Sequence, residues 1–482
     1  MSKIEKIMLA APNDRWFENR HWNSFPYTFG VLTSVLKDRY DVKILDAGHE
    51  DLDFEKVRER IEKYGPDVFG ITCMSLEYTQ NIQKLASIAK SACPDTKVVA
   101  GGIYPTLLPD ALIQNPNVDY EVLGEGEYRF PRLLKHLEGK LEIDKINGIV
   151  FKDNGKPKIN PVEEYIEDLD QLPLPCYENL DLPEYASRAN KYSYYAYPRR
   201  MPYAATVSSR GCPFRCIFCS SKSINGPKIR YRSADSVLKE IDMLVDKYKV
   251  KEIIFMDDNF YMDSERAHKI FSGLIERNYD LEWKSVNAAV YALDDRMLER
   301  MRQSKCYQIS LAVESGTLEG LRRLKKPVSV LQKAKPIIKK ARSLDFEVGA
   351  MFVIGTPGET WDEIRQTMRF AEEIDADYCS FNIATPLPKT ELYEIAIRNN
   401  LLPKDFDFNS LDFKGFGRAT ITTDEFTPEE LQILRAFEWD RINFKTREKA
   451  EKIARMNGLT LEELNAWRVS TRRGLGVKVR YS

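Results

Sequence analysis

The chain has 482 residues, which is too long for one hydrophobic core of ordinary size, so two or three domains are expected. Its 72 Lys and Arg residues are balanced by 73 Asp and Glu residues, which excludes a global basic field for nucleic acid and favours small-molecule chemistry. No run approaches the roughly 18 apolar residues of a membrane helix, and the apolar start before Pro12 is too short for a signal peptide. We therefore expect a cytoplasmic protein with no membrane partner.

Residues 1–142 predict the first domain. Short apolar runs such as "KIMLAAP", "VFGITCM" and "KVVAGG" alternate with amphipathic stretches, a pattern typical of a doubly wound, Rossmann-like parallel sheet. Ligands of such sheets bind at the carboxyl ends of the strands, where glycines let a large ligand approach the backbone. The candidate ligand-binding residues at these ends are Ser75, Gly101, Gly102, Gly124, Glu125, Gly126 and Glu127.

Residues 143–203 predict a hairpin followed by a junction. Asn147-Gly148 and Asn154-Gly155 bracket the strand-like "IVFKD", which indicates a small hairpin appended to the first domain. Residues 161–203 lose periodicity and collect prolines and tyrosines. This composition is too aromatic for a free linker, so we expect the segment to pack along the domain junction.

A second alternating series occupies residues 204–398. Six βα units recur there, which predicts a partial (β/α)6, TIM-like barrel with its chemistry at the carboxyl ends of the strands. Residues 399–482 predict a mostly helical C-terminal cap. Its Arg and Lys content favours a solvated helix face, with a substrate cap as the alternative.

Three of the eight cysteines follow the first barrel strand. Cys212, Cys216 and Cys219 form a C-x3-C-x2-C pattern, and three thiolates on a tight loop can ligate a four-iron, four-sulfur cluster while leaving one iron open. A structural zinc site would need a fourth ligand, yet the next histidine is His268 on a predicted helix. We therefore predict an iron–sulfur site with these three cysteines as ligands.

The string "CPFRCIFC", followed by βα units, resembles the radical S-adenosylmethionine superfamily, and Phe218 matches the aromatic residue usual between the last two cysteines. The resemblance implies that the open iron binds the amino and carboxylate groups of S-adenosylmethionine. It further implies reductive cleavage to methionine and a 5′-deoxyadenosyl radical, with a flavodoxin or ferredoxin-type protein as the electron donor.

Three more segments resemble cofactor contacts of that family. Asp257, Asp258 and Asn259 stand where many members bind the methionine amino group with a Gly-Gly-Glu run, although these residues are also typical of a strand-end turn. Glu314, Ser315 and Gly316 resemble the segment that binds the ribose or the methionine moiety. Ile354 and Gly355, within "FVIGTPGET", resemble the strand that covers the adenine.

The first domain resembles the cobalamin-binding domain of cobalamin-dependent members. The resemblance rests on "FPYTFGVLTSVLKD", "DVKILDAGHEDLD", "VVAGGIYPT" and "VLGEGE". The wider cobalamin fold ligates cobalt through the histidine of Asp-x-His-x-x-Gly, whereas this chain has Asp46-Ala-Gly-His49, one residue longer and without the glycine. We therefore expect the strand-end glycines with Ser75, and not His49, to hold the cobalamin.

These resemblances favour a cobalamin-dependent radical S-adenosylmethionine methyltransferase acting on an unactivated carbon, or on phosphorus, of a small molecule. One alternative is a dehydratase, cyclase or epimerase that transfers no methyl group, and another is a non-catalytic iron–sulfur electron-transfer protein. An epimerase would need a hydrogen donor, for which Cys176 in the tyrosine-rich junction is the candidate catalytic residue, ahead of Cys306 and Cys379. A packed, inert thiol is the other interpretation of Cys176.

Overall fold

A computed structural model describes residues 3–17, 21–408, 418–473 and 475. The chain divides into two compact units, one of residues 1–188 and 223–231 and the other of residues 189–222 and 232–482. The expected junction 143–203 is thus split between Arg188 and Ala189, and the segment 223–231 after the cysteine run returns to the first unit. The predicted fold class, a doubly wound sheet followed by a partial barrel and a helical C-terminal region, is confirmed.

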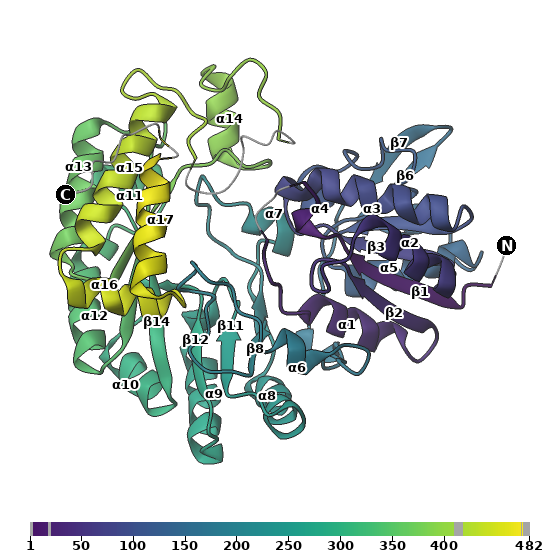
Figure 1. Ribbon diagram of the computed structural model, residues 1–482, viewed down its shortest axis with the longest axis horizontal. Coiled ribbons are helices and arrows are strands. Elements are labelled where there is room, and N and C mark those ends of the chain that lie inside the picture. The colour runs from purple at the N-terminus through teal and green to yellow at the C-terminus, as the bar shows by residue number, and fades with distance from the viewer. Residues whose placement is uncertain (1–2, 18–20, 409–417, 474, 476–482) are drawn as a thin grey trace. The chain divides into compact units, whose positions relative to one another are not determined.

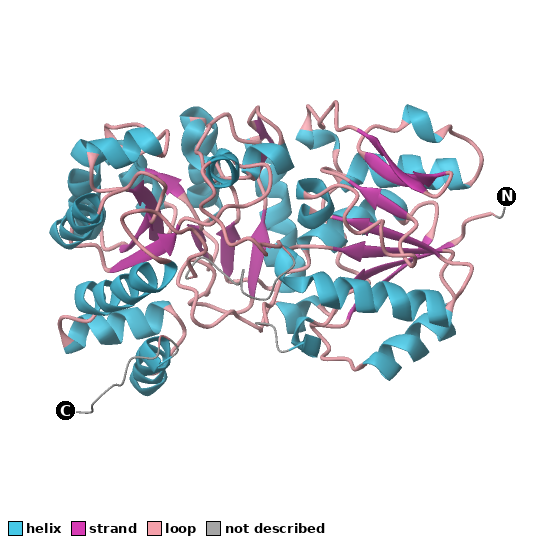
Figure 2. Ribbon diagram, turned by 90° about the horizontal axis from the view of Figure 1, so that it is seen from above, coloured by secondary structure: helices cyan, strands magenta, loops and turns pink. Residues whose placement is uncertain are grey.

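The first unit is built on a seven-stranded sheet of order β2-β1-β3-β4-β5-β6-β7, with helices on both faces (Figure 2). Its parallel strands are β1 (Lys6–Ala11), β2 (Asp41–Asp46), β3 (Val68–Thr72), β4 (Lys97–Gly101) and β5 (Tyr120–Val122). The predicted hairpin, β6 (Ile149–Asp153) and β7 (Lys156–Asn160), extends the sheet in antiparallel pairing with β5. The helices are α1 (Tyr27–Leu36), α2 (Phe54–Tyr64), α3 (Thr79–Ala92), α4 (Ile103–Leu107), α5 (Gly126–Leu137) and α6 (Leu182–Tyr185). The short elements are η1 (Asp14–Phe17), η2 (Leu76–Tyr78), η3 (Ile143–Lys145), η4 (Leu169–Gln171) and β10 (Arg230–Tyr231).

The register of the parallel strands aligns their carboxyl ends at one edge of this sheet. Ala11 pairs with Asp46, and Thr72 pairs with Gly101, so the last residues of β1, β2, β3 and β4 stand in one row. Gly101 also pairs with Val122 at the end of β5. Loops that follow these strands therefore meet at one edge, where a doubly wound sheet binds its ligands.

The second unit is an open barrel of six parallel strands in the order β16-β15-β14-β12-β11-β8 (Figure 1). They are β8 (Tyr203–Thr206), β11 (Glu252–Phe255), β12 (Glu282–Ser285), β14 (Cys306–Glu314), β15 (Glu347–Ile354) and β16 (Tyr378–Ile383). The helices between them are α8 (Ala234–Tyr248), α9 (Ser264–Arg277), α10 (Asp295–Gln303), α11 (Leu318–Arg323), α12 (Val330–Ser343) and α13 (Trp361–Glu373). Helices α14 (Glu391–Arg398), α15 (Pro428–Asn443), α16 (Arg447–Met456) and α17 (Leu461–Arg473) follow the last strand, and α7 (Ser221–Asn225) follows the cysteine run. The short elements are β9 (Ser209–Arg210), β13 (Ala288–Ala289), η5 (Phe260–Met262) and η6 (Val290–Ala292).

The C-terminal helix α15 covers the edge strand β16. The Asn443 side chain accepts from the Cys379 backbone N–H at 2.7 Å and donates to the Cys379 carbonyl at 2.8 Å. Arg435 donates to the Phe381 carbonyl at 2.9 Å. Because an open barrel leaves unpaired backbone groups on its outer strand, α15 satisfies groups that would otherwise invite another strand. One face of α15 is therefore packed against the barrel, while charged residues such as Glu429, Glu430 and Arg441 are exposed.

The tyrosine-rich segment after Ala189 closes the amino end of the barrel. The Tyr194 ring packs on Gly349, where a Cβ atom would lie only 2.2 Å from the ring, and lies 4.7 Å from the Tyr378 ring. The Tyr194 carbonyl accepts from Lys284 at 2.8 Å and from Gln308 at 2.9 Å. Gly349, Tyr378 and Gln308 are among the first three residues of their strands, so this part of the segment packs at the end opposite the cysteine loop and not over a ligand site.

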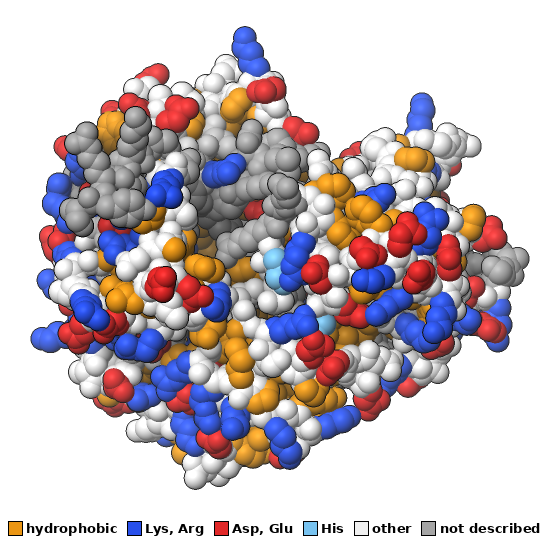
Figure 3. All heavy atoms as spheres, in the orientation of Figure 1, with side chains coloured by type: hydrophobic (Ala, Val, Ile, Leu, Met, Phe, Trp, Pro, Cys, Tyr) orange, Lys and Arg blue, Asp and Glu red, His pale blue; other side chains and the backbone are white. Residues whose placement is uncertain are grey.

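The surface agrees with the balanced composition. On the face seen in Figure 3, acidic and basic side chains are interspersed, as a formal net charge of −1 leads one to expect. None of the described helices combines the length and the apolar character that crossing a bilayer requires.

Candidate active site

The three cysteines of the cluster motif lie on the loop that follows the first barrel strand. Their thiols are close enough to influence one another: burial first, and then the charges of Asp258, Cys216 and Cys212, raise the pKa of Cys219 to about 11. No three His, Cys, Asp or Glu side chains in the described ranges are gathered tightly enough to hold a single metal ion. A four-iron cluster is larger than one ion and spaces its thiolates more widely, so an all-sulfur set of three on one loop fits such a cluster.

Asp257 and Asn259 hold the backbone in front of the cysteines. The fully buried Asp257 carboxylate accepts from the Ser208 N–H at 3.1 Å, the Ser208 hydroxyl at 2.8 Å and the Ser209 hydroxyl at 2.5 Å. Asn259 donates to the Gly211 carbonyl at 3.1 Å. Both side chains shape the loop that leads to Cys212, which agrees with the strand-end turn as the other interpretation, and their contact with S-adenosylmethionine stays a prediction.

Asp258 has a different position from its neighbours. Its carboxylate accepts from the Ser221 hydroxyl, and its negative charge contributes to the raised pKa of Cys219. Of the three residues at the end of β11, Asp258 is therefore the one placed beside the cysteines.

Glu314 ends β14 and forms an ion pair with Lys326. The two charged groups are 2.8 Å apart, and their side chains are 10% and 17% exposed. Burial opposes the charge of Lys326, but the Glu314 carboxylate and then the Cys216 thiol raise the lysine's pKa well above its usual value. The ammonium group also lies 5.7 Å from the centre of the Phe218 ring. Lys326 thus brings a fixed positive charge to the cysteine loop, and sequence reasoning missed it because it belongs to no motif.

The other predicted S-adenosylmethionine contacts shape the strand ends. A Cβ atom at Gly316 would lie 2.6 Å from the Phe370 Cβ on α13, so this glycine permits close packing. Ser315 lies 3.3 Å from the Thr367 hydroxyl.

The turn after β15 is held by a buried carboxylate. Ile354 is fully buried, and Gly355 has a positive φ of 80°. The Glu359 carboxylate accepts from the Gly355 N–H at 2.7 Å and the Thr356 N–H at 2.9 Å, and burial raises its pKa to about 7. Glu359 therefore fixes the turn that follows the predicted adenine-covering strand.

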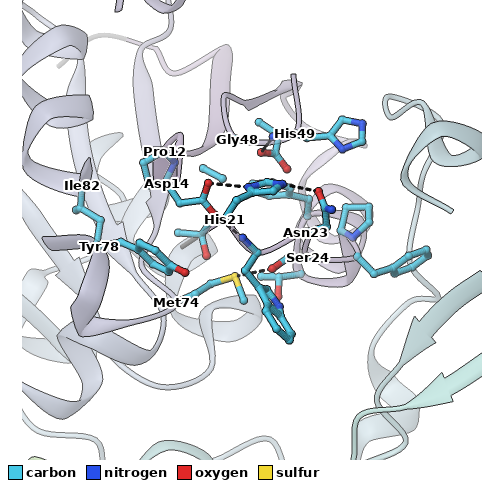
Figure 4. A pocket seen from close by; sticks show the side chains of 18 residues that line it. Pro12, Asp14, His21, Asn23, Ser24, Gly48, His49, Met74, Tyr78 and Ile82 are labelled. Carbon is cyan, nitrogen blue, oxygen red and sulfur yellow. Dashed lines mark hydrogen bonds and ion pairs between the residues drawn. The ribbon is translucent and has the colours of Figure 1, made fainter. Parts of the chain in front are cut away.

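The first unit has its own cavity at the carboxyl edge of its sheet (Figure 4). It contains about 900 Å³ of empty space, its open mouth included. The lining comes from the loops after β1, β2 and β3, and includes Asp14, His21, Asp46, His49 and Met74. Pro12, Asp14 and residues 21–26, all after β1, form much of the wall.

The predicted cradle residues lie at neighbouring strand ends of the same edge, outside this lining. The Ser75 hydroxyl caps η2 by accepting from the Glu77 N–H at 3.3 Å. Gly102 has a φ of 107°, and a Cβ atom there would lie 3.0 Å from the Cys73 carbonyl oxygen. The N–H of Gly124 donates to the Thr106 hydroxyl at 2.7 Å.

Glu125 is occupied by a buried ion pair. Its carboxylate lies 2.7 Å from the guanidinium of Arg230, and the side chains are 5% and 2% exposed. It also accepts from the Ile166 N–H at 2.7 Å, while Gly126 and Glu127 begin α5. This pair fastens the segment 223–231 to the first unit, so the structure gives Glu125 an anchoring role.

His49 is held away from the centre of the cavity. Its ring stacks on Tyr185 with 3.5 Å between ring centres and 9° between planes. The His49 N–H and the Tyr185 hydroxyl each donate to the Asp46 carboxylate at 2.9 Å. Burial lowers the pKa of His49, and its Nε2 lies 3.6 Å from a Glu184 oxygen. These contacts agree with the expectation that His49 does not ligate cobalt, which stays a prediction.

Cys176 belongs to the first unit and is buried beside α1. Its N–H donates to the Gly30 carbonyl at 2.9 Å, and its sulfur lies 3.6 Å from the Lys37 ammonium group. Such contacts are typical of a packed thiol, and the hydrogen-donor role remains a prediction.

Comparison with known proteins finds a matching family model for each of the two units. The Radical SAM superfamily model matches residues 206–371, and the B12 binding domain model matches residues 25–134. An uncharacterized methyltransferase of Pyrococcus horikoshii, PH0819, is 32% identical over 403 residues, which cover 83% of this chain and 85% of the relative. The chain belongs to the cobalamin-binding radical S-adenosylmethionine enzymes.

Two further likenesses extend the comparison. Cytidylyl-2-hydroxyethylphosphonate methyltransferase of Streptomyces wedmorensis is 29% identical over 463 residues, covering 86% of this chain and 85% of that protein. The methyltransferase TsrM of Kitasatospora setae, solved with cobalamin and a [4Fe-4S] cluster, has a TM-score of 0.73 at 16% identity, covering 98% of this chain and 99% of that one. This structural likeness concerns the fold. The cofactors of this radical S-adenosylmethionine enzyme are a [4Fe–4S] cluster, S-adenosylmethionine and cobalamin.

The role of Asp257 can be separated from that of Asp258. Asp257→Ala should lower the iron bound after anaerobic reconstitution to less than half of the wild-type content, because each buried donor that it leaves without an acceptor costs about 1–3 kcal/mol in the loop before Cys212. Asp258→Ala leaves those hydrogen bonds intact and should keep its iron. Iron analysis with a thermal melt of each variant makes the comparison, and full iron in Asp257→Ala would refute the loop-holding role.

Lys326 is expected to bind the carboxylate of S-adenosylmethionine and to favour reduction of the cluster. Lys326→Met should weaken binding about 10-fold or more, since a charge-assisted hydrogen bond contributes about 1.5–3 kcal/mol. Losing a positive charge should also lower the reduction potential. The control is Lys325→Met, which removes a neighbouring lysine whose side chain is 45% exposed and pairs with Glu391. Anaerobic calorimetry and a potentiometric titration measure both effects, and a Lys326 variant that matches the control in both would contradict the assignment.

Proposed function

We propose that this enzyme transfers a methyl group, by way of cobalamin, to an unactivated carbon or to phosphorus of a small molecule. The observation that carries the proposal is the presence in one chain of two distinct sites: a three-thiol loop in the barrel and a cavity at the edge of a cobalamin-binding sheet. Two relatives that span most of the chain are named methyltransferases, which favours methyl transfer over the other reactions considered.

Carbon or phosphorus is proposed as the methyl acceptor because methylation of these atoms is the chemistry that requires both a radical and cobalamin. A hydroxyl, amine or thiol has a lone pair and can take the methyl group of a sulfonium directly, so it needs neither radical nor cobalamin. A carbon without an acidic proton has no such pair and must first lose a hydrogen atom. The relative from Streptomyces wedmorensis is named for a phosphonate substrate, and phosphorus is retained as an acceptor for that reason.

Different residues of the barrel would bind the cluster and S-adenosylmethionine. Cys212, Cys216 and Cys219 would hold three irons, and the bound cluster supplies the electron that cleaves S-adenosylmethionine. Lys326 would donate to the cofactor's carboxylate, while Glu314 keeps that lysine charged and in position. Glu359 would fix the turn after β15, next to the strand end that is predicted to cover the adenine.

The electron must come from outside the chain. We propose a low-potential flavodoxin or ferredoxin-type protein as its source. A thiolate cluster with an open iron persists only in a reducing compartment, which supports a location in the cytoplasm.

The proposal predicts that the two cofactor functions can be separated. Wild-type protein loaded with hydroxocobalamin and reconstituted with iron should retain about one cobalamin through gel filtration and release 5′-deoxyadenosine under a strong reductant. The Cys212→Ala, Cys216→Ala, Cys219→Ala triple variant should retain the cobalamin and release no 5′-deoxyadenosine, because only the cluster loop is changed. Visible spectra and chromatography give the two readouts.

Two results would go against this account. Cleavage of S-adenosylmethionine by the triple variant would show that the cluster site is wrong. Wild-type protein that cleaves S-adenosylmethionine yet binds no cobalamin would exclude methyl transfer and favour a radical dehydratase, cyclase or epimerase.

A further inference from the structure

A second histidine lies in the cavity of the first unit, on the loop between β1 and α1. The His21 ring occupies the middle of the cavity in Figure 4, between Asp14 on one side and Asn23 on the other. Its Nδ1 lies 2.7 Å from Asp14 Oδ1, and its Nε2 lies 2.7 Å from Asn23 Oδ1. The ring is therefore held at both nitrogens inside an open cavity.

Asp14 is built to orient this ring. Its second oxygen, Oδ2, accepts from the Trp22 backbone N–H at 2.7 Å, so the carboxylate ties the start of the loop to its middle. The Asp14 side chain is 11% exposed, and that of His21 is 24% exposed. A mostly buried carboxylate that accepts from one imidazole nitrogen is the arrangement that commonly orients histidines bound to metals, and here the other nitrogen contacts a side chain of the same loop.

His49 differs from His21 in its exposure and in its contacts. Its side chain is 7% exposed and stacked on Tyr185, and in Figure 4 its ring is turned away from His21. To bind a metal in the cavity it would have to leave the Tyr185 stack, which also carries the Asp46 hydrogen bond. His21 needs to give up only its contact with Asn23, a side chain on the same loop.

We propose that His21 ligates the cobalt of the bound cobalamin through Nε2, with Asp14 as its positioning residue; this inference rests on the proposed function. On binding, the Nε2 proton that faces Asn23 Oδ1 is released to solvent, and the freed lone pair forms the bond to cobalt in place of water or the cofactor's own benzimidazole, while Nδ1–H stays on Asp14. Cobalt keeps its oxidation state, so no other reactant is required. The assignment places the axial ligand on the loop after β1 and agrees with the expectation that His49, after β2, does not ligate cobalt.

The test uses the nuclear spin of nitrogen. In the electron paramagnetic resonance spectrum of holoenzyme carrying cob(II)alamin, an axial ¹⁴N ligand splits each cobalt line into three, and ¹⁵N splits it into two. Protein labelled with ¹⁵N only in histidine should therefore give doublets, whereas the benzimidazole nitrogen of cobalamin itself would keep triplets. The chain has four histidines, so single variants identify the one responsible.

The variants give matched expectations. His21→Ala should lose the histidine splitting and regain a nitrogen splitting when free imidazole is added, which also shows that the cavity is folded. His49→Ala is the control and should keep the doublets. Asp14→Asn should keep them too but bind cobalamin about 10- to 100-fold more weakly, as expected for a residue that orients a ligand.

The outcomes separate this inference from the function on which it rests. Cobalamin that stays bound while the labelled wild-type protein shows triplets, or no splitting, overturns the assignment of His21 and leaves the proposed function intact. Doublets that survive in His21→Ala also overturn it. Wild-type protein that retains no cobalamin overturns both.

Discussion

The carboxyl ends of parallel strands are the constraint on which both sites depend. In a parallel sheet every strand ends at the same edge, so loops far apart in sequence meet there without further organisation. In the first unit this brings the loop with His21 beside Asp46 and Met74. In the second it brings Asp258, Glu314 and Ile354 to the end of the barrel that carries the cysteine loop. The aromatic segment around Tyr194 packs at the other end of the barrel and stabilises that sheet.

Buried carboxylates give the loops at these edges their shape. Asp46, Asp257 and Glu359 each accept at least two hydrogen bonds from a nearby turn, loop or helix, and burial raises the pKa of all three. A carboxylate removed from water is costly unless its oxygens are satisfied, so each one favours the single loop conformation that supplies its donors. The buried Glu125 carboxylate likewise requires its partner Arg230, and this pair fixes where the chain returns to the first unit.

The sequence predicted the features that recur in a pattern. Alternating apolar runs identified both sheets, and the spacing of Cys212, Cys216 and Cys219 identified the cluster loop. The sequence did not predict that the segment 223–231 returns to the first unit. Its anchor, Arg230, is one basic residue among several and follows no periodic pattern. The roles of Asp257 and Glu125 were also hidden, since residue type alone does not distinguish a carboxylate that faces a ligand from one that holds a loop. Lys326 and His21 reach their sites through loop conformation, which no spacing rule describes.

We expect each unit to hold its own metal centre at its own sheet edge. Anomalous diffraction from crystals of the reconstituted holoenzyme, collected above and below the iron and cobalt absorption edges, tests it directly. The account predicts an iron maximum among the sulfurs of Cys212, Cys216 and Cys219, and a separate cobalt maximum over the cavity lined by His21 and Met74. Cobalt signal absent from the first unit, or iron bound away from the three cysteines, would contradict it.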